Sequence, residues 1–204
     1  MRSQQTLKKV IPVEYAISVL HDGDVLATSG YGGHGIPELL LAALEERFLE
    51  TGQPKGLTLV HASGQGDAKE KGLNLLAHEG LLQRVIGGHF GLAPKIVELV
   101  QDNKIQAYNL PEGVMTHLYR DIAAGKPGTL SKVGLGTFVD PRLEGGKLNS
   151  VTTEDMVELM TINGEEYLFY KALPITVAFI RGTTADPDGN ITVEKEALHL
   201  ENLA

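Results

Sequence analysis

Glycines cluster at three places in this chain, each time beside side chains that could contact a ligand. Residues 29–37 read SGYGGHGIP, residues 63–66 read SGQG, and residues 87–91 read GGHFG. Glycine lets a backbone come close to a ligand and adopts positive φ at little cost, so these segments could hold a small molecule with backbone N–H groups. The chain has no cysteine, which excludes thiol nucleophiles, thiolate metal ligands and disulfides.

The first cluster also matches a dinucleotide-binding pattern, because Gly30, Gly32 and Gly35 have the spacing G-x-G-x-x-G. That pattern expects an acidic residue at the end of the next strand, where it would bind the ribose. The next expected strand, residues 57–60, is followed by His61-Ala62-Ser63 instead. A dinucleotide site is therefore disfavoured, and an ordinary strand-to-helix turn remains the alternative to a ligand loop.

The elements that must position these clusters alternate along the chain. Apolar strands alternate with helical patterns, which predicts an α/β fold with an open, mostly parallel sheet flanked by helices. We expect strands at 25–28, 57–60, 84–86, 105–109, 176–181 and 191–195, and helices at 13–20, 37–50, 73–82, 94–101 and 114–124. In the second helix Pro37 suits the first position, and the expected buried stripe is Leu39, Leu40, Ala43 and Leu44. Near 157–170, Asn163-Gly164 predicts an inserted β-hairpin.

The three glycine clusters follow strands and precede helices or loops, so they are expected at one edge of the sheet. Ligands bind outside the carboxyl ends of strands in open α/β sheets, and the clusters are therefore expected to line one crevice. The candidate binding residues are Gly30, Tyr31, Gly32, Gly33, His34, Gly35, Ser63, Gly64, Gln65, Gly66, Gly88, His89 and Phe90.

Composition narrows the class of protein. The 204 residues suit a single domain, and the net charge of −8 with no cluster of Lys and Arg argues against a nucleic-acid partner. No apolar run approaches the roughly 18 residues of a membrane span, and the histidines lack the spacing of metal ligands. We expect a cytoplasmic protein without a metal or a membrane contact.

A series of ordered motifs resembles the first half of the family I coenzyme A transferases. SGYGGHGIPE follows Asp22-Gly23-Asp24, and further matches continue to the last residues: AHEGLL, GGHFG, AYNLPEG, KVGLGTFVDPR, GGKLN, EYLFY and IRGTTAD. The resemblance implies ping-pong transfer of coenzyme A (CoA) between short carboxylic acids such as acetate or propionate. CoA would be a substrate rather than a tightly bound cofactor, and the candidate residues would shape the acyl pocket.

The resemblance also implies a nucleophilic glutamate that forms a glutamyl-CoA thioester, and this family places it in the second half or in a β subunit. The Glu-Gly pairs at Glu79, Glu112 and Glu144 fall in first-half motifs, so none is a candidate. We therefore expect the domain to be incomplete at its C-terminus, to need a second half or subunit in an oligomer, and to be inactive alone.

Glu112 differs from the family pattern, since many members have Pro-Gln-Gly where this chain has Pro111-Glu112-Gly113. The family's Gln is implied to donate a hydrogen bond to the thioester carbonyl, which a carboxylate can do only when it is protonated. Glu112 is thus a candidate catalytic residue or, equally, a favourable charge at a helix N-terminus. Two other functions stay open: a non-catalytic acyl-CoA-binding protein and a sugar-phosphate isomerase-like enzyme.

Overall fold

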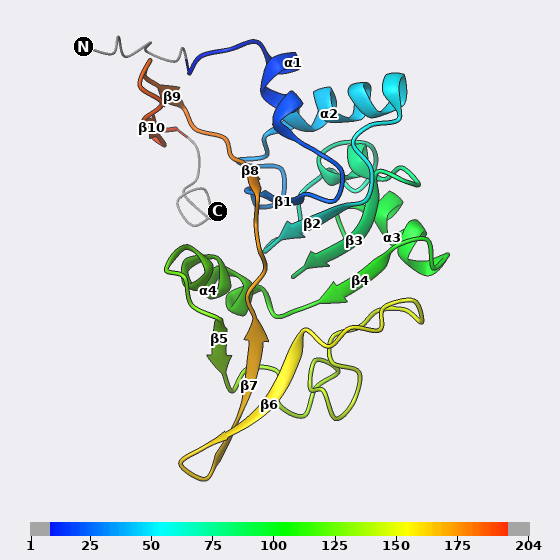
Figure 1. Cartoon of the computed structure of the whole chain (residues 1–204), viewed down its shortest axis with the longest axis vertical. Helices are drawn as coiled ribbons and strands as arrows, with labels where there is room; N and C mark the ends of the chain where they lie inside the picture. Colours follow the sequence, from blue (N-terminus) through cyan, green and yellow to red (C-terminus); the bar gives the residue numbers. More distant parts are fainter. Residues whose placement is uncertain (1–8, 196–204) are drawn as a thin grey trace, which may run out of the picture.

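A wholly parallel five-stranded sheet forms the centre of the protein. The computed structural model describes residues 9–195. The strand order is β4-β3-β2-β1-β8, and every neighbouring pair is parallel (Figure 1). The strands are β1 (Val25–Thr28), β2 (Leu57–His61), β3 (Leu82–Gly87), β4 (Gln106–Asn109) and β8 (Val177–Phe179). The predicted α/β fold class is confirmed.

Helices cover both faces of this sheet, and the strands bury side chains on both. One face packs against α1 (Val13–Ala16), the 3-10 turn η1 (Ile17–Val19), α2 (Glu38–Thr51), the 3-10 turn η2 (Leu73–Leu76) and α3 (Pro94–Gln101). The other face packs against α4 (Glu112–Ala123). Leu59 of β2 lies in the first core and its neighbour Val60 in the second. Burial on both faces explains why the strands read as apolar runs rather than as alternating patterns.

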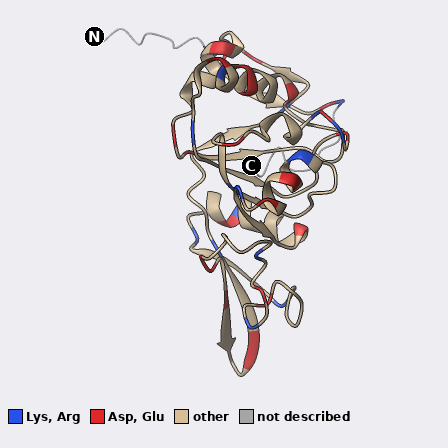
Figure 2. Cartoon of the chain, turned by 90° about the vertical axis from the view of Figure 1, so that its right-hand side faces the viewer, with Lys and Arg blue, Asp and Glu red and all other residues tan. Residues whose placement is uncertain are grey.

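A second, antiparallel sheet extends away from one end of the parallel sheet (Figures 1 and 2). Its order is β5-β7-β6, with β5 (Gly128–Ser131), β6 (Val157–Ile162) and β7 (Glu165–Lys171). Asn163 and Gly164 turn β6 into β7 with φ of 53° and 82°, the positive values that a two-residue type I′ turn requires. The predicted hairpin is confirmed, whereas β5 was not predicted. A short pair, β9 (Thr184–Ala185) and β10 (Ile191–Thr192), ends the described chain.

The helix predicted over residues 73–82 is wrong. Only η2 (Leu73–Leu76) forms there, and the chain then turns through Gly80, whose φ is 94°, into β3. Leu73, Leu76 and Leu81 are fully buried, but they reach the core from a turn and a loop. The spacing of these leucines resembles that of one helical face, although separate segments bury them.

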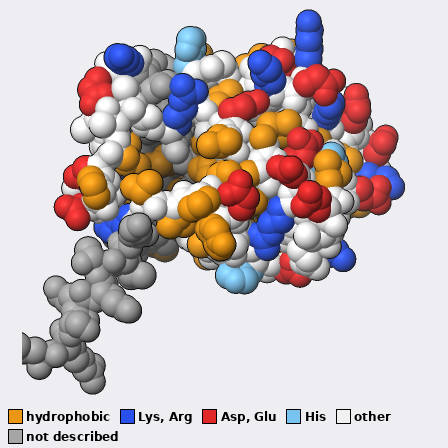
Figure 3. All heavy atoms as spheres, turned by 90° about the horizontal axis from the view of Figure 1, so that it is seen from above, with side chains coloured by type: hydrophobic (Ala, Val, Ile, Leu, Met, Phe, Trp, Pro, Cys, Tyr) orange, Lys and Arg blue, Asp and Glu red, His pale blue; other side chains and the backbone are white. Residues whose placement is uncertain are grey.

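The buried stripe of α2 is also shifted from its prediction. Leu39 is 70% exposed, while Leu41 and Leu44 are fully buried. Pro37 precedes the helix as its N-cap residue instead of occupying the first position. Exposed apolar side chains on α1, η1 and α2 belong to Tyr15, Val19, Leu39 and Leu49, and Figure 3 shows apolar side chains gathered on this face.

Basic and acidic residues are interspersed along the ribbon over the body of the molecule (Figure 2). Several form ion pairs between neighbouring segments, among them Arg84 with Glu154 and Lys104 with Glu79. Asp140 and Arg142 form another ion pair, with 2.7 Å between Oδ2 and Nη2. Of the helices formed by residues 9–195, none has both the length and the apolar character needed to cross a bilayer.

Candidate functional site

Four loops meet at the carboxyl edge of the parallel sheet. They follow β1, β2, β3 and β4, whose last residues are Thr28, His61, Gly87 and Asn109. These strands are neighbours in register, with Thr28 beside His61 and His61 beside Gly87. The three glycine clusters therefore leave one edge of the sheet side by side, and the start of α4 joins them.

The loops after β1 and β2 are joined by backbone hydrogen bonds. The Gly32 N–H donates to the Gly64 carbonyl at 2.7 Å, and the Gly66 N–H donates to the Gly32 carbonyl at 3.0 Å. Gly30 has a φ of 126°, and a Cβ there would lie 3.0 Å from the His34 carbonyl oxygen. The first turn therefore needs glycine to fold back on itself and to lie against the second loop.

Two further glycines let the loops after β2 and β3 approach the start of α4. A Cβ on Gly88 would lie 2.1 Å from the Ala62 carbonyl oxygen and 2.9 Å from the Cα of Glu112. A Cβ on Gly64 would lie 2.4 Å from Nδ1 of His89. At Gly88 the obstacle is backbone, so the absence of a Cβ sets the distance between that loop and α4, whereas at Gly64 a Cβ would require the His89 ring to move.

A small cavity lies where these loops meet. Its volume is about 120 Å³, and its lining residues are Tyr31, Gly32, Ser63, Gly64, His89, Leu92 and Glu112. At roughly 30 Å³ per water molecule, this space suits about four waters or one small organic group. We call it the loop cavity.

The predicted binding residues divide into two groups. Tyr31, Gly32, Ser63, Gly64 and His89 line the loop cavity together with Glu112. The others surround it without lining it: Gly30, Gly33, His34 and Gly35 form the first turn, Gln65 and Gly66 are buried residues of the second loop, and Gly88 and Phe90 line a neighbouring cavity. Leu92 lines the loop cavity but was not predicted, since nothing distinguishes one leucine from the core leucines in the sequence.

His61 supports the second loop from below and was given no role by the sequence. It is 1% exposed, and its Nδ1 lies 2.9 Å from the Ser63 carbonyl oxygen. Phe90 packs edge-on against the ring, at 5.2 Å between centroids, and Gly87 makes room for it, since a Cβ there would lie 2.3 Å from Nε2. Desolvation by burial lowers the pKa of His61 to about 4, so the ring is neutral near pH 7 and Nδ1–H donates to Ser63. In the sequence, the feature that could have pointed to His61 is that a polar residue ends an otherwise apolar strand.

Four buried polar atoms near the ends of β1 and β2 have no hydrogen-bond partner among the described residues: Thr28 Oγ1, Ser29 Oγ, His61 Nε2 and Gln65 Oε1. The amide nitrogen of Gln65 donates to the Thr28 carbonyl at 3.1 Å, which ties the end of β1 to the second loop. Buried polar groups are usually paired, and groups that lack a protein partner are often paired with water or a ligand. Their concentration at one edge marks this edge as the candidate site.

Glu112 is the first residue of α4 and faces the loop cavity. Its side chain is half-buried, and its carboxylate has no hydrogen-bond or ion-pair partner within residues 9–195. A negative charge in the first turn stabilises a helix through the N-terminal dipole. The position fits this structural role and also brings the carboxyl group to the cavity, and the donor role remains a prediction.

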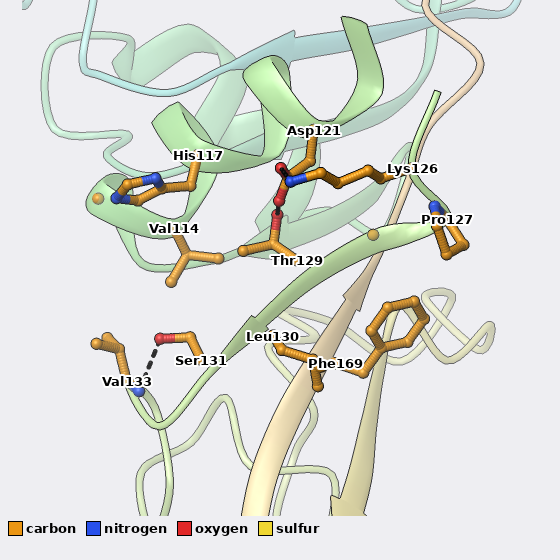
Figure 4. A pocket seen from close by; sticks show the side chains of 12 residues that line it. Val114, His117, Asp121, Lys126, Pro127, Thr129, Leu130, Ser131, Val133 and Phe169 are labelled. Atoms are coloured by element: carbon orange, nitrogen blue, oxygen red, sulfur yellow. Dashed lines mark hydrogen bonds and ion pairs between the residues drawn. The ribbon is translucent and has the colours of Figure 1, made fainter. Parts of the chain in front are cut away.

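A larger cavity of about 800 Å³ lies elsewhere, between α4 and β5 (Figure 4). The charged side chains there bind each other: Asp121 accepts hydrogen bonds from Lys126 at 2.6 Å and from Thr129 at 2.7 Å. These contacts lower the pKa of Asp121. None of the predicted binding residues lines this space, so its size does not make it the candidate site.

Within the described part of the chain, His, Asp and Glu side chains form no group of three or more that could hold a metal ion. The site is a small cavity whose lining combines backbone groups with the polar residues Tyr31, Ser63, His89 and Glu112. An open parallel sheet with such a cavity at its carboxyl edge is the ligand-binding arrangement of α/β enzymes.

Comparison with known proteins identifies the class more closely. The family model for coenzyme A transferases matches residues 11–204. The chain therefore belongs to the coenzyme A transferase family.

Individual relatives agree with this assignment. The chain is 48% identical to the caffeate CoA-transferase of Acetobacterium woodii, over 97% of the chain and 38% of that protein. It is 27% identical to the acetate CoA-transferase subunit alpha of Escherichia coli K12, over 96% of the chain and 79% of that subunit. The acyl-CoA transferase YdiF of Escherichia coli O157:H7 superposes with TM-scores of 0.92 as apoenzyme and 0.89 as a thioester complex with CoA, at 42% identity.

Those two superpositions cover 95% and 91% of this chain, and 38% and 36% of the YdiF chains. The chain thus spans less than two fifths of the length of the caffeate enzyme and of YdiF, but most of the length of a separate alpha subunit.

Proposed function

We propose that this chain is the alpha half of an acyl-CoA:carboxylate CoA-transferase that acts on short-chain carboxylic acids. The observation that carries the proposal is the loop cavity, which is formed by the carboxyl-edge loops and has Glu112 in its lining. Its small volume suits a short acyl group. The name of an alpha-subunit relative, which specifies acetate, supports the same class of acid.

The proposed reaction is ping-pong and uses a glutamate outside this chain. The glutamate carboxylate attacks the thioester carbonyl of the donor acyl-CoA. The C–S bond breaks, CoA departs as a thiolate, and an acyl-glutamyl anhydride remains. The thiolate then attacks the glutamyl carbonyl and releases the donor acid as its carboxylate, leaving a glutamyl-CoA thioester. The acceptor carboxylate repeats both steps in reverse. A relative solved as a thioester complex with CoA supports this route.

The chain's own contribution would be to enclose the acyl group and stabilise the oxyanion. Backbone groups of the loops at Gly32 and Gly64 surround the cavity, and Glu112 lies at its wall. A protonated Glu112 would donate a hydrogen bond to the carbonyl oxygen as negative charge develops there. We propose this donor role for the assembled enzyme, in which a second half would cover this edge.

The partner would be a second half or beta subunit, and the two would form an oligomer in the cytoplasm. The coverage of the relatives supports this division, because the chain spans 79% of a separate alpha subunit but only 38% of the longer caffeate enzyme, to which it is more similar in sequence. CoA would enter only as a substrate, with no metal and no tightly bound cofactor. We propose that residues 1–204 form a single alpha-type domain that is inactive alone.

Reconstitution tests this proposal. The chain is mixed with the second half of its own protein or of a close relative, and transfer of CoA from acetyl-CoA to labelled propionate is measured. Activity is expected from the mixture and not from either part. Turnover by the isolated chain would contradict the division of labour, and binding of acyl-CoA without turnover in the mixture would favour a non-catalytic binding protein.

The lining of the loop cavity disfavours the isomerase alternative. Among residues 9–195, no Lys or Arg lines it, so this part of the chain offers no cation there for a sugar phosphate.

A further inference from the structure

A second cavity lies beside the loop cavity and is larger and more apolar. Its volume is about 300 Å³, and its lining residues are Gly88, His89, Phe90, Val97, Val100, Asn109 and Leu148. We call it the side cavity. The loop after β3 supplies one wall, α3 supplies the opposite wall through two valines, and Leu148 stands at the open edge of β4.

Leu148 is held in place by the backbone, although its side chain is 41% exposed. Its N–H donates to the Ala107 carbonyl at 3.0 Å, and the Asn109 N–H donates to the Gly146 carbonyl at 2.8 Å. The segment around Leu148 therefore pairs antiparallel with β4, as the bridge between Tyr108 and Lys147 also shows. The outer wall of the side cavity is thus fixed to the sheet.

His89 separates the two cavities, because it is the residue that lines both. It is exposed, and the absence of a Cβ on Gly64 leaves room for its ring, which lies against both Gly64 and Gly91. The two cavities therefore adjoin at this side chain.

The chemistry of the side cavity suits a hydrocarbon group and not a nucleotide. The described part of the chain places no Lys or Arg in its lining, so a diphosphate would find no cationic partner from these residues. The amide nitrogen of Asn109 already donates to the Gly87 carbonyl at 3.0 Å. The cavity is roughly twice the size of an apolar cavity of about 150 Å³ that accommodates benzene.

On the basis of the proposed CoA transfer, we infer that the side cavity binds the apolar tail of the carboxylic acid. The accepted substrates then include, besides the short acids, acids that carry a phenyl ring or a chain of about six carbons beyond the carboxyl group, such as 3-phenylpropionate. His89 sets the acid specificity from its place between the cavities. The acyl range extends beyond acetate and propionate.

The test compares two acids in the assembled protein. The ratio of kcat/KM for 3-phenylpropionate to kcat/KM for acetate is measured for the parent and for Val97→Phe, which fills the side cavity from α3. Glu98→Phe is the matched control, since it adds the same ring at the next, exposed position of α3. We expect Val97→Phe to lower the ratio at least tenfold and the control to keep the parental ratio.

A second variant and a binding measurement keep the test decisive. Leu148→Phe fills the cavity from its mouth and replaces Val97→Phe if that variant does not fold. Binding of 3-phenylpropionate to the 204-residue chain is followed by the methyl NMR signals of Val97, Val100 and Leu148, which we expect to shift with this acid and not with acetate. This readout needs no turnover.

The outcomes separate the inference from the proposed function. Transfer to both acids with an unchanged ratio in the filled variants would overturn the inference and leave the function intact. Weaker assembly without a change in ratio would also overturn it, because protein and not substrate would then cover the cavity. If no acid is a substrate, the proposed function fails, and the NMR shifts alone decide whether the side cavity binds the aryl acid.

Discussion

The buried ring of His61 makes the stability of this chain depend on pH in a defined window. The pKa of His61 is lowered from 6.5 to about 4 by desolvation, with a smaller repulsion from His89 in the same direction. Between these two values the unfolded chain binds a proton at this ring that the folded chain does not. Stability therefore rises with pH through the window, is fully present above about pH 6.5, and levels off below about pH 4.

The size of the effect follows from the two pKa values. Their difference corresponds to about 3 kcal/mol between the limits, of which about 2 kcal/mol is lost between pH 7.5 and pH 5. Replacing His61 by Gln removes the titrating group. The free energy of unfolding of the parent should then fall by about 2 kcal/mol more over this interval than that of the variant.

Urea unfolding of the 204-residue chain at the two pH values measures this difference. His21→Gln is the control, because it removes an exposed histidine, with 81% of its side chain accessible, and keeps His61. The control should lose stability with falling pH as the parent does. Equal losses in the parent and in His61→Gln would refute the reasoning, since the ring would then be protonated as readily in the folded chain as in the unfolded one.

Three further predictions concern the loops and the fold. Gly88→Ala should lower the free energy of unfolding by about 1–3 kcal/mol in thermal or urea unfolding, because its Cβ would lie 2.1 Å from a carbonyl oxygen. Gly113→Ala is the control and should cost little, since a Cβ there would have nothing within 4 Å. Equal effects of the two substitutions would contradict the close approach at Gly88. Asp140→Asn should lower the free energy of unfolding by about 1–3 kcal/mol, because Asp140 is 1% exposed and forms an ion pair. The control Asp102→Asn, on the surface, should change it by no more than about 0.5 kcal/mol. An unchanged melting temperature for Asp140→Asn would refute a stabilising role for this ion pair. In the assembled enzyme, Glu112→Gln should retain or raise kcat, because the neutral Gln amide already carries N–H donors and does not have to be protonated first. Loss of most activity would contradict the simple donor role.

The sequence predicted the parallel sheet well because its strands are short apolar runs bounded by glycine or polar residues. β1 and α3 have the bounds expected, and Asn163-Gly164 located the hairpin correctly. These signals are local, so a single sequence carries them. The same locality explains the error at residues 73–82, where leucines that different segments bury imitated one helical face.

Tertiary packing accounts for what the sequence left out. β5 is an edge strand whose pairing depends on β7, some 40 residues later, and its own four residues carry no alternating pattern. Leu39 could not be told from Leu41, because which one faces the sheet depends on the orientation of α2. The glycine loops of the candidate site were found through their composition. His61 and the side cavity could be recognised only from the way the loop after β3 packs on its neighbours.

The central claim is that residues 1–204 form the acyl-binding walls while a glutamate outside them reacts. Its most direct test is to incubate the assembled protein with acyl-CoA, quench it, and map the CoA-modified residue by peptide mass spectrometry. The account predicts a CoA adduct on a glutamate of the second half, and no adduct on this chain. An adduct on any acidic residue of this chain, Glu112 included, would contradict it.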